Sequence, residues 1–280
     1  MKYLFAILPL LLSIGGCQPG QKPAAAAPAA AMVQPAAARA PQPFKSVLHK
    51  AETRGETRAS WLLGKHTFSF NRYYDPDRMN FGLLRVLNDD HIAGGGGFPT
   101  HPHENMEIVT IQLEGGLAHR DNTGGSGTIR PNEVQVMTAG TGVQHSEVNA
   151  SATEASKLLQ IWVFPNEMGL TPRYDQKRFD PAKRQGRWQA LVSPNDPEAL
   201  RIHQNAVFSR GDFPSGTAAR YDMQFPGNGV YAFILSGACR INGQPLQARD
   251  GFGVWDTGHI EVETAADTEI LLIEVPMINR

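Results

Sequence analysis

The sequence predicts an all-β fold built from two barrels in tandem. Three observations lead to this prediction: short β-favouring runs recur along the chain, Gly, Pro, Asn or Asp residues bound them, and no long segment shows helical periodicity. The expected strands fall at 81–87, 107–113, 134–138, 158–164, 230–235, 252–255, 259–263 and 269–275. Both halves contain a similar number of them, which favours two stacked β-barrels.

The first 17 residues are predicted to be a signal peptide. Lys2 supplies a positive charge, and the apolar run at 4–12 is far shorter than the roughly 20 residues that a membrane-spanning helix needs. The small residues before Cys17 resemble the lipobox of bacterial lipoproteins, in which the cysteine is lipidated and becomes the new N-terminus. The alternative is a simple secretory signal in which Cys17 has no special role.

Residues 18–43 are predicted to be a disordered linker. They are rich in Ala, Pro and Gln and contain almost no large apolar side chains, so they cannot bury enough surface to offset the entropy cost of ordering. Joined to a lipidated Cys17, this linker would tether the folded part to a membrane on the periplasmic side of the bacterial cell envelope. Gln18 follows the cysteine in place of Asp, which favours the outer membrane by resemblance to lipoprotein sorting rules; the inner membrane stays open.

Folded sequence is expected from Phe44 onward, about 235 residues, with one domain at 44–175 and a second at 176–280. The join is expected in 165–193, which is rich in proline and charge. The 26 Lys and Arg residues nearly balance the 27 Asp and Glu residues, so charge gives no reason to expect a nucleic-acid partner. With Cys17 assigned to the lipobox, Cys239 has no partner for a disulfide, and stability must come from a packed core.

Two short motifs carry side chains that bind transition metals. A glycine run at 94–97 leads to a His-x-His motif, His101 and His103, and a His-x-Glu motif, His145 and Glu147, begins 44 residues after the first histidine. Residues two apart in a strand point to the same side. Two facing strands would therefore place three imidazoles and one carboxylate around a single point. The presence of both motifs favours this metal site over exposed histidines in glycine-rich loops.

The donor set consists of nitrogen and oxygen, which suits Fe, Mn, Co, Ni, Cu or Zn. It contains no thiolate, which argues against a purely structural zinc cluster. The second half has only His203 and His259, which lie far apart and form no His-x-His motif. The metal is therefore expected in the first domain only.

The segments 100–115 and 136–147, which enclose the two motifs, resemble the first and second cupin motifs as they appear in the pirin family. Further segments similar to bacterial pirin-like proteins are 61–62, 66–70, 73–76, 84–90 and 171–174. The resemblance covers Phe44 to the C-terminus. It implies two cupin (double-stranded β-helix) barrels in tandem, with a metal in the N-terminal barrel. Its ligands, carried over by position, are His101, His103, His145 and Glu147.

Two further residues need separate interpretation. Glu107 has the spacing at which other cupins place a coordinating glutamate, but the coordinating carboxylate of pirins matches Glu147. Glu107 is therefore expected to be structural or to support the ligands, with metal binding as the alternative. His119 lies between the two motifs and is expected at the surface, with a place in the pocket as the alternative.

The resemblance favours iron as the metal, in the form Fe(II), with Ni, Mn, Co, Cu or Zn as alternatives. It implies an oxygenase similar to the quercetin 2,3-dioxygenases found among bacterial pirins, acting on a small flavonol-like aromatic and dioxygen. Glu147 would also be catalytic, as the general base that accepts the proton of the substrate hydroxyl. Two alternatives stay open: a non-catalytic metal-binding or redox-sensing envelope protein, and a cupin whose metal is only structural.

Overall fold

The computed structural model describes residues 43–277. The predicted signal peptide at 1–17 and nearly all of the predicted linker at 18–43 lie outside the described residues. Residues 43–277 form 21 β-strands and two short 3-10 helices, Ala51–Thr53 and Pro181–Arg184, so the all-β prediction is confirmed. No helix within this range is long and apolar enough to cross a membrane.

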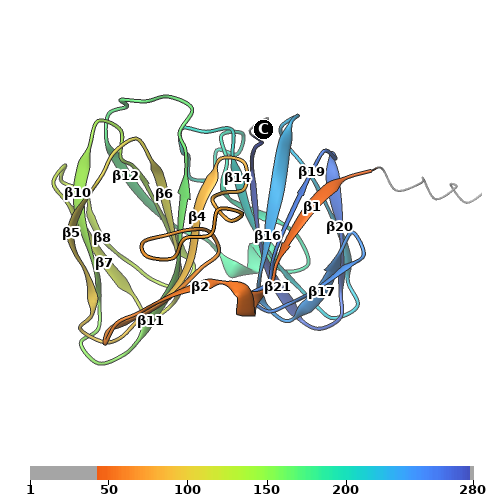
Figure 1. Ribbon diagram of the computed structural model, residues 1–280, viewed down its shortest axis with the longest axis horizontal. Helices are drawn as coiled ribbons and strands as arrows, with labels where there is room; N and C mark the ends of the chain where they lie inside the picture. Colours follow the sequence, from red (N-terminus) through yellow and green to blue (C-terminus); the bar gives the residue numbers. More distant parts are fainter. Residues whose placement is uncertain (1–42, 278–280) are drawn as a thin grey trace, which may run out of the picture. The chain divides into compact units, whose positions relative to one another are not determined.

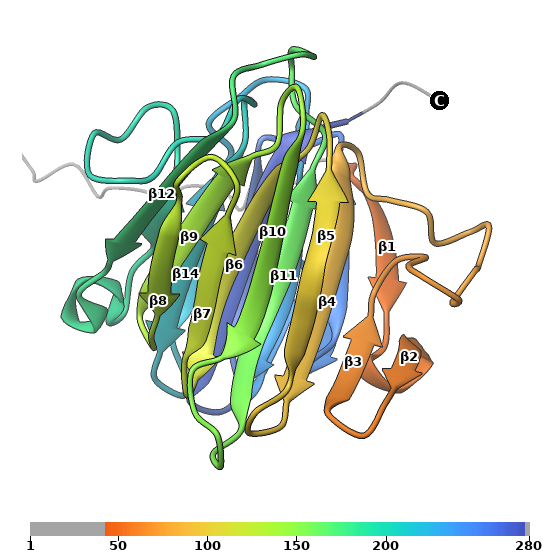
Figure 2. The same cartoon turned by 90° about the vertical axis from the view of Figure 1, so that its left-hand side faces the viewer.

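Two antiparallel sheets form the first barrel (Figure 2). The larger sheet has seven strands in the order β12 (Arg173–Arg178), β9 (Glu133–Thr138), β6 (Glu107–Glu114), β11 (Ser156–Val163), β4 (Leu84–Ile92), β3 (Leu62–His66) and β2 (Gly55–Arg58). The smaller sheet has four strands in the order β5 (Gly97–His103), β10 (Val143–Asn149), β7 (Leu117–Asp121) and β8 (Ser126–Ile129). Apolar side chains fill the two ends of this barrel, with Ile92 and Leu158 in one cluster and Ile108 and Met137 in the other.

The second barrel repeats the plan with two more antiparallel sheets. Its six-stranded sheet runs in the order β1 (Lys45–His49), β19 (Gly251–Trp255), β16 (Asn228–Ser236), β21 (Thr268–Pro276), β14 (Val207–Phe213) and β13 (Gln189–Val192). Its four-stranded sheet runs in the order β15 (Ala218–Asp222), β20 (His259–Thr264), β17 (Ala238–Ile241) and β18 (Gln244–Gln247). A continuous apolar core that includes the unpaired Cys239 fills its interior.

The two large sheets pack against each other through one hydrophobic cluster. Ile111 and Ile161 of the seven-stranded sheet belong to the same buried cluster as Tyr231 and Ile273 of the six-stranded sheet. Because side chains alternate along a strand, the neighbours of these residues point the other way, into the barrels. Thr110, next to Ile111, is one of them. The interior of the first barrel is therefore where polar side chains of the seven-stranded sheet can meet a ligand.

The chain passes from one barrel to the other twice, once before the strands of the first barrel and once after them. β1 pairs with β19, so the first strand lies in the sheet of the second barrel, as Figure 1 shows in orange beside blue. β12 is the outer strand of the seven-stranded sheet, and the predicted boundary between residues 175 and 176 falls inside it. The proline-rich stretch at 165–193 therefore contributes one strand to each barrel, β12 to the first and β13 to the second.

β4 is longer than the sequence suggests. Its expected end at residue 87 rested on the run of Asn and Asp residues that follows, but the strand continues to Ile92. β3 pairs with it on one side and β11 on the other, and these ladders satisfy the backbone of the polar residues. Asn88 and Asp90 are consequently strand residues whose side chains are buried.

Candidate metal centre

β5 and β10 bring the three predicted histidines together. The two strands pair antiparallel with His101 opposite His145. The ring centroids of His101 and His103 lie 4.4 and 4.8 Å from that of His145. The possible ligand atoms of the three histidines all lie within 4.8 Å of one another. Pro102 is tolerated between the first two because β5 is the edge strand of its sheet.

Glu147 points into the barrel on the same side as His145, because buried and less buried residues alternate regularly along β10 and its pairing with β7 is unbroken. The register with β5 shifts between these two residues, so that Glu147 lies opposite Phe98 and the extra residue of the bulge belongs to β5. Glu147 is buried, and its carboxylate belongs to a second group of possible ligand atoms within 4.8 Å of one another, formed with His145 and His119. His145 is thus shared between the cluster of histidines and the carboxylate.

The carboxylate of Glu147 is held by one oxygen only. Gln160 Nε2 donates a 2.8 Å hydrogen bond to Glu147 Oε2, and Thr110 Oγ1 donates to Gln160 Oε1 at 3.1 Å, which fixes the orientation of the amide. Glu147 Oε1 is buried and has no hydrogen-bond partner among the described residues. Burial raises the pKa of Glu147 to about 7. A cation beside the free oxygen would stabilise the ionised form.

His145 also presents one free atom. Its Nδ1 lies 3.3 Å from His119 Nδ1, and His119 Nε2 lies 3.1 Å from Asp121 Oδ2. A carboxylate only accepts, so His119 Nε2–H donates to Asp121, and His119 Nδ1 accepts from His145 Nδ1–H. This leaves the lone pair on His145 Nε2, an atom that is buried without a partner among residues 43–277. Second-sphere carboxylate–histidine pairs orient metal ligands in this way.

The electrostatics favour neutral imidazoles, the form that binds a metal. Burial, followed by the charges of the neighbouring histidines, lowers the pKa of His145 to about 2. Burial and then the charge of His101 lower the pKa of His103 to about 4. At neutral pH His103 and His145 therefore have nitrogen lone pairs available.

The residues fit a transition metal. Buried polar atoms in proteins almost always have a partner, and here two unpartnered atoms, His145 Nε2 and Glu147 Oε1, belong to two of the predicted ligands. His101 and His103 form one group with His145, whereas Glu147 belongs to the other group, so the two groups meet only at His145. Together they offer the nitrogen and oxygen donors that suit a divalent transition metal.

The structure places the two residues whose roles the sequence left open, His119 and Glu107. The expectation that His119 lies at the surface is wrong: it is 3% exposed, and Tyr174 stacks on its ring at a centroid distance of 4.7 Å. Glu107 is buried at the start of β6 and accepts a 2.9 Å hydrogen bond from Thr138 Oγ1. It belongs to neither group of possible ligands among the described residues, which agrees with the structural interpretation.

A cavity of about 530 Å³ opens beside the histidines. His101, His103 and Glu147 lie in its wall together with the aromatic residues Phe70, Phe98 and Trp162, and Trp162 packs on His103 at a centroid distance of 4.9 Å. Flat apolar walls and a metal centre at one side suit a planar aromatic molecule. The complete lining is Thr57, Leu62, His66, Phe70, Asn71, Asn88, Asp90, Phe98, Pro99, His101, His103, Glu147, Gln160 and Trp162.

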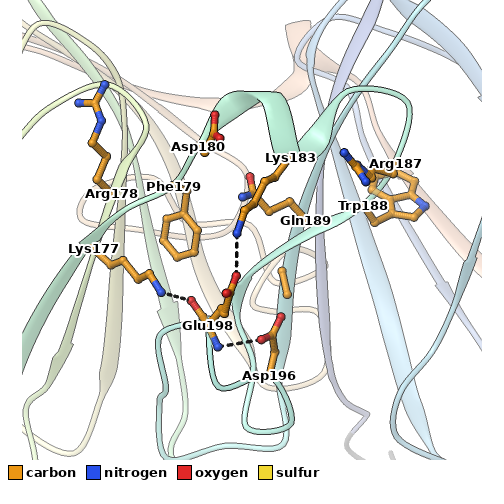
Figure 3. Close-up of a pocket in the computed structure, with 11 residues that line it drawn as sticks. Lys177, Arg178, Phe179, Asp180, Lys183, Arg187, Trp188, Gln189, Asp196 and Glu198 are labelled. Atoms are coloured by element: carbon orange, nitrogen blue, oxygen red, sulfur yellow. Dashed lines mark hydrogen bonds and ion pairs between the residues drawn. The ribbon is translucent and has the colours of Figure 1, made fainter.

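A second cavity of about 570 Å³ lies in the 177–198 region and has no comparable donor set (Figure 3). Several of its charged side chains already bond to groups in the same region. Lys183 Nζ lies 2.8 Å from Glu198 Oε2, and Lys177 Nζ donates to the backbone carbonyl of Glu198. The Glu198 amide in turn donates to Asp196 Oδ1 at 2.8 Å. The cavity beside the histidines is therefore the better candidate for a substrate site.

Comparison with known proteins finds relatives along most of the chain. A family model described as Pirin matches residues 47–163, and one described as Quercetinase C-terminal cupin domain matches residues 190–275. The quercetin 2,3-dioxygenase of Escherichia coli K12 is 41% identical over 232 residues, which cover 82% of this chain and 99% of the relative. A pirin-like protein of Caulobacter vibrioides is 39% identical over 216 residues, 76% of this chain and 92% of the relative.

Solved structures agree with the sequence relatives. The crystal structure of YhhW from Escherichia coli is 40% identical, with a TM-score of 0.80 over 84% of this chain and 100% of that one. The structure of the same bacterial pirin in complex with nickel(II) is 40% identical with a TM-score of 0.78 over the same shares of the two chains.

Proposed function

Because this chain belongs to the pirin family, we propose that it is a metal-dependent dioxygenase that acts on quercetin or a related flavonol. The observation that carries the proposal is the pair of buried, unpartnered atoms, His145 Nε2 and Glu147 Oε1, beside a cavity with aromatic walls. The relative at 41% identity that is named quercetin 2,3-dioxygenase supports the choice of substrate class.

His101, His103, His145 and Glu147 together hold one divalent transition metal in this proposal. Fe(II) is the favoured ion, and nickel, which the related bacterial pirin binds, is the first alternative; Mn, Co, Cu and Zn also suit the donor set. When bound, the metal lowers the pKa of a coordinated substrate hydroxyl and provides the redox-active centre for dioxygen chemistry.

The protein's own residues position the substrate and move its proton. Phe70, Phe98 and Trp162 line the cavity and hold the flat rings while they exclude water. Glu147 is also the general base in this proposal: as a ligand that loosens from the metal, its carboxylate accepts the proton of the flavonol hydroxyl. Gln160 keeps the carboxylate in place through its hydrogen bond to Oε2. Dioxygen then cleaves the heterocyclic ring, with loss of carbon monoxide.

The proposal is tested by metal analysis together with oxygen uptake on quercetin. We expect about one metal ion per chain and uptake that disappears in His101→Ala and Glu147→Ala. His91→Ala is the matched control, because His91 is an exposed residue of the same barrel. Bound metal without uptake on any flavonol would refute the oxygenase and leave a metal-binding or redox-sensing protein. Activity at the wild-type level in both site variants would refute the site.

The location of the protein is a separate proposal. We infer from the sequence that Cys17 is lipidated and that residues 18–43 tether the folded part to a membrane of the bacterial cell envelope, on the periplasmic side and with the outer membrane favoured. The wild-type chain should then sediment with membranes, and Cys17→Ser should not. Equal fractionation of the two chains would contradict the tether.

A further inference from the structure

The cavity beside the histidines has a second polar end. Gln160, which contacts Glu147, is the cross-strand neighbour of Asn88, and Asn88 is the neighbour of His66 on the next strand. Strands in a sheet lie about 4.8 Å apart, so roughly 10 Å separate Gln160 from His66. Asp90 lies two residues beyond Asn88 on β4, and both Asp90 and His66 line the cavity. A molecule that fills the cavity therefore meets polar groups away from the histidine cluster as well as beside it.

At this second end, Asp90 is the polar group without a partner. Its side chain is 4% exposed, and no described residue donates a hydrogen bond to its carboxyl group. Its cross-strand neighbours are Gly64 and Leu158, which offer no polar side chain. Burial, and then the charges of Asp89 and Glu147, raise the pKa of Asp90 to about 8. Near neutral pH the group can consequently donate a hydrogen bond as well as accept one.

The imidazole of His66 is already satisfied. His66 Nδ1 lies 2.8 Å from Asn88 Oδ1, and His66 Nε2 lies 2.8 Å from Thr57 Oγ1. Both nitrogens of this imidazole are therefore in use. The Asp90 carboxyl group and the amide nitrogen of Asn88 remain to meet a ligand at this end, and of the two only Asp90 can accept a hydrogen bond from a hydroxyl.

Gly64 leaves the room in which these side chains lie. A Cβ at this position would be 2.8 Å from Asp90 Oδ1 and 3.2 Å from His66 Cε1. A carboxyl oxygen does not tolerate a methyl group at 2.8 Å, so any larger residue would displace Asp90. The glycine thus helps to hold the carboxyl group at the cavity wall.

Resting on the proposed flavonol substrate, we propose that Asp90 is a specificity-determining residue that hydrogen-bonds a ring hydroxyl remote from the hydroxyl at the metal centre. One cavity of about 530 Å³ has His101, His103 and Glu147 in its wall as well as Asp90, and Phe70, Phe98 and Trp162 supply aromatic surface in the same cavity. A flavonol without the remote hydroxyl leaves Asp90 buried and unpaired. Sites built to bind a hydroxyl discriminate strongly against such analogues.

The test compares the binding of quercetin with that of 3-hydroxyflavone, which keeps only the hydroxyl proposed to meet the metal. Dissociation constants are measured by absorbance with the metal-loaded protein in the absence of oxygen. We expect the wild-type protein to prefer quercetin by about tenfold or more. In Asp90→Leu this preference should fall to near unity, through weaker binding of quercetin and unchanged or tighter binding of 3-hydroxyflavone. Asp90→Asn, which can still hydrogen-bond, should retain part of the preference.

Two further variants serve as control and as an independent test. His91→Ala changes an exposed residue next to Asp90 in the sequence that does not line the cavity, and it should leave the preference unchanged. Gly64→Ala should lower the preference without removing any polar group, because it displaces Asp90. Metal content and melting temperature establish that each variant is folded and loaded.

The outcomes separate this inference from the proposed function. If the wild-type protein turns over quercetin and Asp90→Leu keeps the same preference between the two flavonols, the role of Asp90 is refuted and the oxygenase stands. If the wild-type protein binds neither flavonol, both proposals are refuted. An equal loss of affinity for both flavonols in Asp90→Leu would also overturn the inference, because it indicates general damage to the cavity.

Discussion

His119 Nδ1 lies 3.3 Å from His145 Nδ1, and both side chains are buried. The contact joins a predicted metal ligand to a residue outside the predicted ligand set. Asp121 completes the chain of hydrogen bonds on the far side of His119. The arrangement fixes which nitrogen of His145 carries its proton, and it leaves the other nitrogen free for a metal.

Removing His119 should therefore weaken metal binding. His119→Ala deletes the acceptor for His145 Nδ1–H, and loss of such a supporting contact typically costs roughly 10- to 100-fold in metal affinity. His119→Asn places an amide oxygen near the position of Nδ1 and should recover part of the loss. Affinity is measured by competition with a chelator, with His91→Ala as the control. Equal affinities in all four proteins would contradict the positioning role.

Metal affinity should depend on pH through Glu147. Its carboxyl group, whose pKa burial raises to about 7, must lose its proton to bind, whereas the lowered pKa values of His103 and His145 leave these imidazoles neutral well below pH 7. Below about pH 7 the apparent affinity should fall about tenfold per pH unit, and above it the profile should flatten. Glu147→Gln should remove the break. A break that persists in this variant would assign it to another group.

The metal-free protein should lose stability as the pH rises from 6.5 to 8.5. Burial raises the pKa of Asp90 to about 8 and those of Glu107 and Glu147 to about 7, so the folded state holds protons that the unfolded state has released. Stability from such groups is present at low pH and is lost as the pH passes through the folded pKa values. For Asp90 alone the loss is about 2 kcal/mol.

Urea unfolding of the metal-free protein at several pH values measures this effect, and Asp90→Asn should flatten the profile. The buried histidines do not mask it. The pKa values of His49, His103 and His145 are lowered, so their contribution changes only below the ordinary histidine pKa. A free energy of unfolding that rises between pH 6.5 and 8.5 would show that other groups dominate.

The contact between β1 and the second barrel should be sensitive to one hydroxyl group. Tyr231 is fully buried in the cluster between the two large sheets, and its hydroxyl lies 2.8 Å from His49 Nδ1 on β1. Tyr231→Phe leaves this buried nitrogen without its partner, which should lower the free energy of unfolding by about 1–3 kcal/mol. Metal affinity should stay the same. A variant as stable as the wild-type protein would show that His49 finds another partner.

The position of a strand could be predicted from the sequence where the strand coincides with a run of apolar residues. The expected strands at 107–113, 134–138 and 269–275 correspond to β6, β9 and β21 with small differences at their ends. The predicted strand at 81–87 ends too early, because the second half of β4 is polar and has the composition of a turn. Polar residues are stable in that strand because partner strands satisfy its backbone on both sides and the cavity accommodates Asp90.

The sequence indicated some residues of the site and gave no signal for others. The spacing within each motif identified His101, His103, His145 and Glu147 as candidate metal ligands. The structure brings the three histidines together. His119 and Asp90 carried no comparable signal. A single histidine between two motifs and an aspartate in an Asn-Asp-Asp run have no spacing that points to a site, and only their burial gives them a role.

The sequence by itself determined the all-β fold, the family and the residues that can donate to a metal. These depend on local patterns, because the alternation of side chains along a strand sets which neighbours share a face. Only the tertiary structure decided which partner each donor meets. The contacts of His145 with His119, of Glu147 with Gln160, and the placing of Asp90 in the cavity wall all depend on pairing between strands that are distant in sequence.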